Sequence, residues 1–117
     1  MNTYSPDRWV LVGITSKEHA TIQKILAGWY GGFAVSDSWK LSSGNVTFID
    51  KGDYYESLQE SGSTYKLYKA SEGFTGLTAG MFKHWGLLLE EEGCRIQQVD
   101  VKSAVKMINV KEKSNEV

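Results

Sequence analysis

Few side chains in this sequence have the type and spacing that catalysis or metal binding requires. His19, His84 and Cys94 are the candidate metal ligands besides the carboxylates, but no two of them have a recognised zinc spacing. A nucleophilic mechanism would need Ser38 beside Asp37, or Cys94 with a histidine. The sequence has no Gly-x-Ser-x-Gly turn, the motif that exposes a serine nucleophile in many hydrolases. We therefore expect a non-enzyme that needs no metal and no cofactor.

Acidic and glycine-rich segments give no stronger indication of chemistry. Four carboxylates gather around one expected hairpin, at Asp50, Asp53, Glu56 and Glu60. Acidic residues are usual on a solvated hairpin, so this cluster does not predict acid–base catalysis. The glycines at 28, 31 and 32 do not precede a helix in the strand–loop–helix order of a phosphate-binding loop. A small enzyme of unknown class remains an alternative.

An aromatic cluster is the most informative segment. Gly28-Trp29-Tyr30-Gly31-Gly32-Phe33 is followed by Asp37-Ser38-Trp39-Lys40. Tryptophan and tyrosine are enriched at the energetic centres of protein interfaces. We therefore predict a protein-binding surface at Trp29, Tyr30, Asp37, Trp39 and Lys40. An exposed sheet edge could also pair with a second copy of the chain to form a homodimer.

Binding of a single-stranded nucleic acid is the alternative to protein binding. Aromatic platforms with interleaved basic residues on a sheet stack unpaired bases. The residues that could supply this pattern are Trp29, Tyr30, Trp39, Lys40, Tyr65, Lys66, Tyr68 and Lys69. The net charge is −1, with 13 Lys+Arg against 14 Asp+Glu, which argues against duplex DNA or an anionic membrane as a partner.

Length and composition indicate one globular domain. The chain has 117 residues, of which 41% are hydrophobic and 23% charged. We expect a domain over residues 1–110 and a frayed tail over 111–117. One cysteine excludes an internal disulfide, and the N-terminal residues lack the pattern of a signal peptide, so we expect a cytoplasmic location. No apolar run approaches the ~20 residues that cross a bilayer.

The first two thirds of the sequence have the pattern of strands separated by turns. We expect strands at Arg8–Thr15, Thr21–Tyr30, Phe33–Leu41, Val46–Asp50, Tyr54–Glu60 and Thr64–Ala70. The nearly continuous apolar run of the first strand indicates burial of both its faces. Residues 22–26 also match a short helical stripe, but the short preceding loop favours a hairpin. Turns at intervals of roughly ten residues indicate an antiparallel meander.

After Gly76 the apolar period becomes helical. The apolar residues Leu77, Met81, Trp85, Leu88 and Leu89 recur at helical intervals, with Phe82 alongside, which predicts a helix over Leu77–Glu92. Thr78 is the expected N-cap and Gly93 the expected residue after its end.

We expect this helix to pack on one face of the sheet against Trp9 and Leu11. Cys94–Val101 reads as a last strand, and a short C-terminal helix follows, with Asp100 available as its cap. The expected fold is α+β, with an antiparallel sheet of about six strands.

Part of the chain resembles a family of small uncharacterised proteins encoded by tailed phages and prophages. The resemblance covers roughly residues 8–70 and lies in Gly28-Trp29-Tyr30-Gly31-Gly32, Asp37-Ser38-Trp39-Lys40-Leu41-Ser42-Ser43-Gly44 and Asp53-Tyr54-Tyr55. Small accessory phage proteins often bind and redirect host proteins, including components of antiviral defence. The resemblance therefore implies a modulator or inhibitor of a host complex, and it carries over no functional residue.

Overall fold

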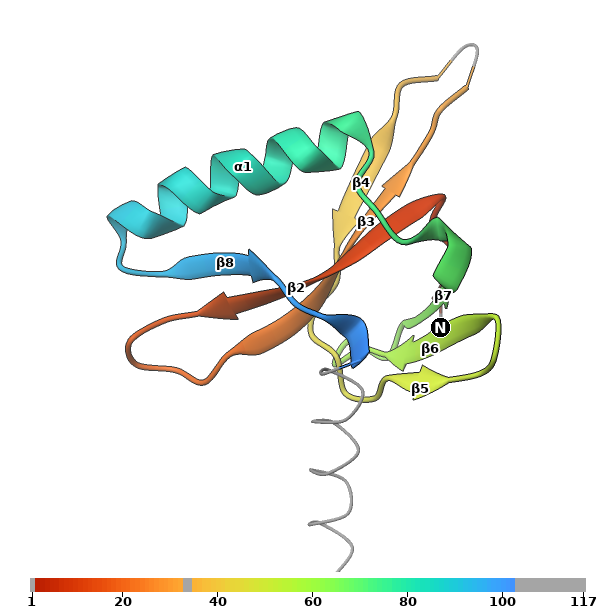
Figure 1. The fold of residues 1–117 in the computed structure, drawn as a ribbon, viewed down its shortest axis with the longest axis horizontal. Coiled ribbons are helices and arrows are strands. Elements are labelled where there is room, and N and C mark those ends of the chain that lie inside the picture. The colour runs from red at the N-terminus through yellow and green to blue at the C-terminus, as the bar shows by residue number, and fades with distance from the viewer. Residues whose placement is uncertain (1, 33–34, 103–117) are drawn as a thin grey trace, which may run out of the picture.

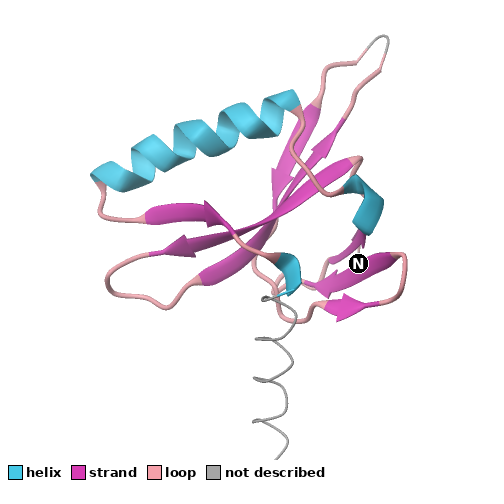
Figure 2. Ribbon diagram, in the orientation of Figure 1, coloured by secondary structure: helices cyan, strands magenta, loops and turns pink. Residues whose placement is uncertain are grey.

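The computed structural model describes residues 2–32 and 35–102, which form an α+β fold (Figures 1 and 2). In chain order the strands are β1 (Thr3–Tyr4), β2 (Arg8–Thr15), β3 (Ile22–Trp29), β4 (Ser38–Leu41), β5 (Ile49–Asp50), β6 (Tyr54–Leu58), β7 (Thr64–Tyr68) and β8 (Arg95–Gln98). Helix α1 (Gly76–Glu91) lies between β7 and β8, and a short 3-10 helix covers Lys69–Ser71. The prediction of an α+β fold with one main helix is confirmed.

The strands form two sheets rather than one. One sheet has the order β1-β7-β6-β5 and the other the order β4-β3-β2-β8. All neighbouring strands are antiparallel except β1 and β7, which are parallel. The expected meander of about six strands is therefore wrong in strand number and connectivity. Turn spacing marks where strands end, but it does not say which strands pair.

Strand β2 separates two apolar cores, so that the molecule has three layers. On one side of the strand, Trp9 and Leu11 pack with Phe48 and Leu67 of the first-sheet layer. Trp9 also donates a hydrogen bond from Nε1 to the carbonyl of Tyr68, at 2.8 Å. Burial of both faces of β2 was correctly predicted from its apolar run.

The opposite side of β2 is covered by α1, as Figure 1 shows. Val10 and Val12 belong to the core on that side, against which Phe82, Trp85 and Leu89 of α1 pack. The expectation that the helix meets Trp9 and Leu11 is therefore wrong. Because side chains alternate along a strand and both faces of β2 are apolar, the sequence could not tell which face the helix covers.

The start of α1 differs from the prediction. Its N-cap is Thr75, whose Oγ1 accepts a hydrogen bond from the Thr78 amide at 3.1 Å. The Thr78 hydroxyl accepts in return from the Thr75 amide at 2.8 Å. Thr78 is thus the third helical residue of a capping box and not the N-cap itself. Gly93 has a φ of 76°, as expected for the residue that follows a helix end.

Several strands are shorter than expected. Of Phe33–Leu41, only Ser38–Leu41 is a strand among the described residues, and the two-residue β1 was not predicted at all. At the other end, the Asp100 carboxylate accepts a hydrogen bond from the Lys102 amide at 3.2 Å. The expected C-terminal helix beyond Lys102, and the expected tail over 111–117, lie outside the described residues.

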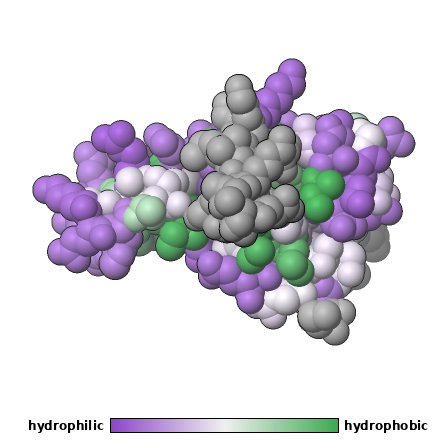
Figure 3. Space-filling model, turned by 90° about the horizontal axis from the view of Figure 1, so that it is seen from below, coloured by the Kyte–Doolittle hydropathy of each residue, from purple (hydrophilic) through white to green (hydrophobic). Residues whose placement is uncertain are grey.

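The face of the molecule seen from below carries both hydrophilic and hydrophobic residues (Figure 3). Figure 3 shows hydrophilic residues at both ends of this face and separate hydrophobic groups toward its middle. No helix of the described residues is long and apolar enough to cross a membrane.

Candidate interaction surfaces

The glycine-rich aromatic segment lies in the arm formed by β3 and β4, which Figure 1 shows extending past the end of α1. At the base of its turn, the Asp37 carboxylate accepts a hydrogen bond from the Gly31 amide at 3.0 Å. A Cβ on residue 31 would overlap the Val35 carbonyl oxygen, and Gly32 has a φ of +74°. Asp37, Gly31 and Gly32 therefore have structural roles in the turn. These roles account for the glycines and the aspartate of the aromatic segment.

Gly28 lets the start of α1 approach the sheet. A Cβ on this residue would lie 2.7 Å from Cγ2 of Thr75 and 3.0 Å from Cγ2 of Thr78. The capping box therefore lies directly on β3, with both threonines fully buried. This contact fixes the helix beside β4 and so determines what the aromatic residues of the arm can reach.

Strand β4 divides the five predicted binding residues between two faces. Trp39 is paired with Gly28, on the side that α1 covers, whereas Lys40 is paired with Ala27, which belongs to the other core. Trp29 is on the same side as Lys40. The residues that are adjacent in sequence therefore do not form one surface, because successive side chains of a strand point in opposite directions.

On the Lys40 side, the aromatic residues join the two sheets. The Lys40 ammonium lies 4.9 Å from the ring centroid of Tyr4, and Trp29 packs edge-on against the same ring at 6.3 Å. Trp29 also donates from Nε1 to the Ser5 carbonyl at 3.3 Å. Trp29 is half-buried, so its main observed contacts hold β1 against the arm. Tyr30 is 53% exposed and extends from the end of β3.

On the Trp39 side, an apolar surface runs from β4 onto the helix. Trp39 is 40% exposed and packs against Trp85 of α1, with ring centroids 5.1 Å apart. Spacings of four, four and three residues place Leu77, Met81, Trp85 and Leu88 along one side of the helix. Leu77 and Leu88 are 36% and 48% exposed. We call this set, Trp39 with the four helix residues, the apolar flank.

The four helix residues of the apolar flank, Leu77, Met81, Trp85 and Leu88, were not predicted to belong to a binding surface. Their helical spacing was attributed to core packing, and Trp85 does pack against the core beside Phe82 and Leu89. The exposed fractions of Leu77 and Leu88 could not be read from the period, since a wide apolar stripe can exceed the width that the sheet covers.

The residues proposed for base stacking are also rearranged. Tyr65 is 1% exposed and belongs to the core, so it is not available to stack a base. On the outer face of β6 and β7, however, the rings of Tyr54 and Tyr68 lie 5.6 Å apart. The Lys66 ammonium lies 4.5 Å from the first ring and 5.2 Å from the second. Tyr54 was missed because only its cross-strand pairing with Tyr68 brings it to this face.

The groups considered for catalysis are dispersed. His84 is exposed on α1, and Cys94 follows the helix and is half-buried. Within residues 2–32 and 35–102, no three His, Cys, Asp or Glu side chains are grouped so that they could hold a metal ion. Ser38 and Asp37 are neighbours in the arm, but Asp37 accepts its hydrogen bond from Gly31.

The described residues form a three-layer α+β fold with exposed apolar side chains on Trp39 and on α1. No family model matches the sequence, and no curated protein or solved structure shows significant similarity to it.

Proposed function

We propose that this protein is a non-catalytic protein-binding module and that the apolar flank is its binding surface. The observation that carries the proposal is the half-exposed Trp39, packed on Trp85 between two exposed leucines. Large aromatic side chains surrounded by apolar residues are common at the energetic centre of protein interfaces. Large exposed apolar patches are uncommon on monomeric proteins and mark interaction sites.

The proposal extends to the biological setting through the resemblance in residues 8–70. A small phage-encoded protein with an apolar binding surface would act by occupying a host protein, and a host complex that includes antiviral defence components is the partner class we propose. Of the five residues expected from sequence, Trp39 belongs to the apolar flank. Tyr30 and Lys40 would contribute only if the partner reached around the edge of β4.

Affinity capture from a bacterial lysate, with and without nuclease, tests this function. The informative variant is Leu88→Asp, since this side chain is 48% exposed and the substitution places a charge on the apolar flank without emptying the core. Leu58→Asp is the matched control, because Leu58 is 38% exposed on β6, in the other sheet. We expect a defined protein to bind the wild type and the control and to be lost from Leu88→Asp.

Either of two results would contradict the proposal: equal capture by both variants, or capture that disappears with nuclease. Circular dichroism and thermal unfolding of each variant establish that it is folded before capture is compared. A Trp39→Ser variant provides a second disruption from β4 instead of α1, so that loss in both variants assigns the surface and not one residue.

Single-stranded nucleic acid is a second candidate ligand, favoured by Tyr54, Tyr68 and Lys66 on the outer sheet face. Their arrangement offers aromatic surface beside a cation. Titration of a fluorescent single-stranded oligonucleotide tests it. If this face binds bases, Tyr54→Ala should weaken binding by about 1–3 kcal/mol, whereas the exposed Tyr30→Ala should not. Affinity should also fall steeply with salt.

A further inference from the structure

Strand β8 is the outer strand of its sheet, and its free side offers a regular set of backbone groups. The Val99 amide, one residue beyond β8, donates to the Leu11 carbonyl of β2 at 2.9 Å. In an antiparallel pair, every second residue directs its amide and carbonyl toward the neighbouring strand. The amides and carbonyls of Gln97 and Arg95, two and four residues before Val99, therefore point toward β2. Those of Ile96 point toward the free side of the sheet.

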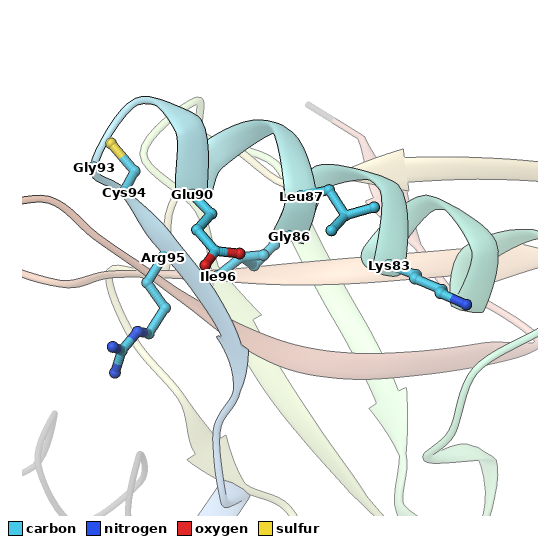
Figure 4. Close-up of a pocket in the computed structure, with 8 residues that line it drawn as sticks. All are labelled: Lys83, Gly86, Leu87, Glu90, Gly93, Cys94, Arg95 and Ile96. Atoms are coloured by element: carbon cyan, nitrogen blue, oxygen red, sulfur yellow. The ribbon is translucent and has the colours of Figure 1, made fainter.

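An open groove lies between this strand and the second half of α1, as Figure 4 shows. Its volume is about 550 Å³, and its lining includes Lys83, Gly86, Leu87, Glu90 and Ile96. Gly86 lies over Ile96: a Cβ on the glycine would be 4.0 Å from the isoleucine Cγ2. We take Gly86 and Ile96 as the centre of the groove. The backbone amide and carbonyl that point to the free side of β8 therefore lie at this centre.

Three charged residues line the groove: Lys83 and Glu90 of α1 lie on either side of this centre, and Arg95 of β8 is next to Ile96. Lys83 is three residues before Gly86 and Glu90 is four after it, which along a helix corresponds to about 4.5 Å and about 6 Å. Neither forms an ion pair with a described residue. Leu87, next to the centre, is 62% exposed, the second largest exposed fraction among the large apolar side chains of the described residues.

We propose that this groove is a two-fold interface with a second copy of the chain. A two-fold axis perpendicular to the sheet, midway between the two strands at the level of Ile96, pairs β8 with β8 of the partner subunit in antiparallel fashion. The outward amide and carbonyl of Ile96 then meet those of Ile96 of the partner subunit. This register keeps side chains on matching faces, which an axis between two residues would not.

The same axis makes the charges complementary. Because Lys83 and Glu90 are nearly equidistant from the centre, the rotation brings Lys83 opposite Glu90 of the partner subunit, and Glu90 opposite Lys83 of the partner subunit. Leu87 meets Leu87 of the partner subunit near the axis and loses its exposure to water. Self-complementarity of this kind is what an isologous interface requires, and it selects a second copy over an unrelated peptide strand.

Charge reversal provides a test that only this arrangement passes. In Lys83→Glu the four facing charges of the two helices become acidic, and in Glu90→Lys these four become basic, while Arg95 is unchanged in both. Each variant alone should therefore dissociate at least about tenfold more readily than the wild type. An equimolar mixture should recover association, because one chain then supplies both acids and the other both bases. The double variant should also recover it.

Sedimentation velocity of the full chain, from micromolar to near-millimolar concentration, provides the readout. Glu91→Lys is the matched control, since Glu91 is an exposed acid on the same helix that does not line the groove. A wild type that stays monomeric throughout would overturn the proposal. So would a dimer that persists unchanged in both single reversals, or a mixture of the two that remains monomeric. The interface lies on the β8 side of α1, so these results are independent of binding at the apolar flank.

Discussion

Trp39 and Trp85 pack edge to face, with ring centroids 5.1 Å apart and ring planes at 69°. This pair joins the outer strand β4 to helix α1 while leaving 40% of Trp39 exposed. The contact therefore has a stabilising role and a surface role together. Which role dominates determines how the protein responds when one ring is removed.

Trp39→Ala should lower the free energy of unfolding by about 1–2 kcal/mol, the loss of one aromatic pair and part of one buried ring. The domain should stay folded. Trp9→Ala is the comparison, because Trp9 is completely buried and its removal should cost about 3–5 kcal/mol. Urea denaturation followed by circular dichroism measures both values. Equal costs would show that Trp39 is in practice a core residue.

Gly28→Ala should destabilise the protein by about 1–3 kcal/mol, because the new methyl group would overlap Cγ2 of Thr75 at 2.7 Å. Gly80→Ala, in the exposed part of α1, meets no atom within 4 Å and should instead stabilise by about 0.5–1 kcal/mol. Thermal unfolding of the two variants should therefore shift in opposite directions. A neutral Gly28→Ala would mean that the helix can move away from β3 at little cost.

Thr75→Ala should lower stability by about 1 kcal/mol, since it removes the hydroxyl that accepts from the Thr78 amide. Thr75→Ser keeps that hydroxyl and should retain most of the stability. Both variants lose the threonine methyl group, so the difference between their stabilities measures the contribution of the capping hydroxyl. Guanidinium denaturation provides the comparison, and an equal loss in both variants would assign the effect to packing on Gly28.

Tyr65 should make stability fall at high pH. Burial raises the pKa of its phenol from 10.0 to about 12. Below pH 10 the folded and unfolded states both keep the proton, and the contribution to stability is complete. As the pH rises toward 12 the unfolded state releases the proton first, so about 2–3 kcal/mol is lost.

The variant Tyr65→Phe should lack this part of the alkaline loss. At pH 7 it should be neutral or slightly stabilising, because the Tyr65 hydroxyl has no hydrogen-bond partner among the described protein groups. Urea midpoints measured from pH 7 to high pH, in both proteins, give the difference curve. Parallel curves would show that the phenol reaches solvent in the folded state.

The strand and helix positions were largely predictable, whereas their assembly was not. The apolar run of β2 and the helical spacing from Leu77 are local signals, and both identified the right element. Pairing of β1 with β7 depends on residues more than fifty positions apart, and a two-residue strand has no period of its own. A local sequence pattern therefore could not show whether the strands form one sheet or two.

The candidate surface was predictable only in part, for a similar reason. Aromatic composition drew attention to the arm, but alternation along β4 places Trp39 and Lys40 on opposite faces. The helix residues that complete the apolar flank could not be distinguished from core residues, because exposure depends on where the sheet ends beneath α1. The groove beside β8 has no signal in composition, since its centre is a glycine.

The position of β2 between the two cores has a consequence for how the molecule opens. A single eight-residue strand carries Val10 and Val12 into one core and Trp9 and Leu11 into the other. Neither core can come apart without disturbing the strand that they share, so the two should melt as one cooperative unit. Amide hydrogens in the middle of β2 should then exchange with solvent only when the whole fold opens, and a substitution under α1 should accelerate exchange in the layer on the far side.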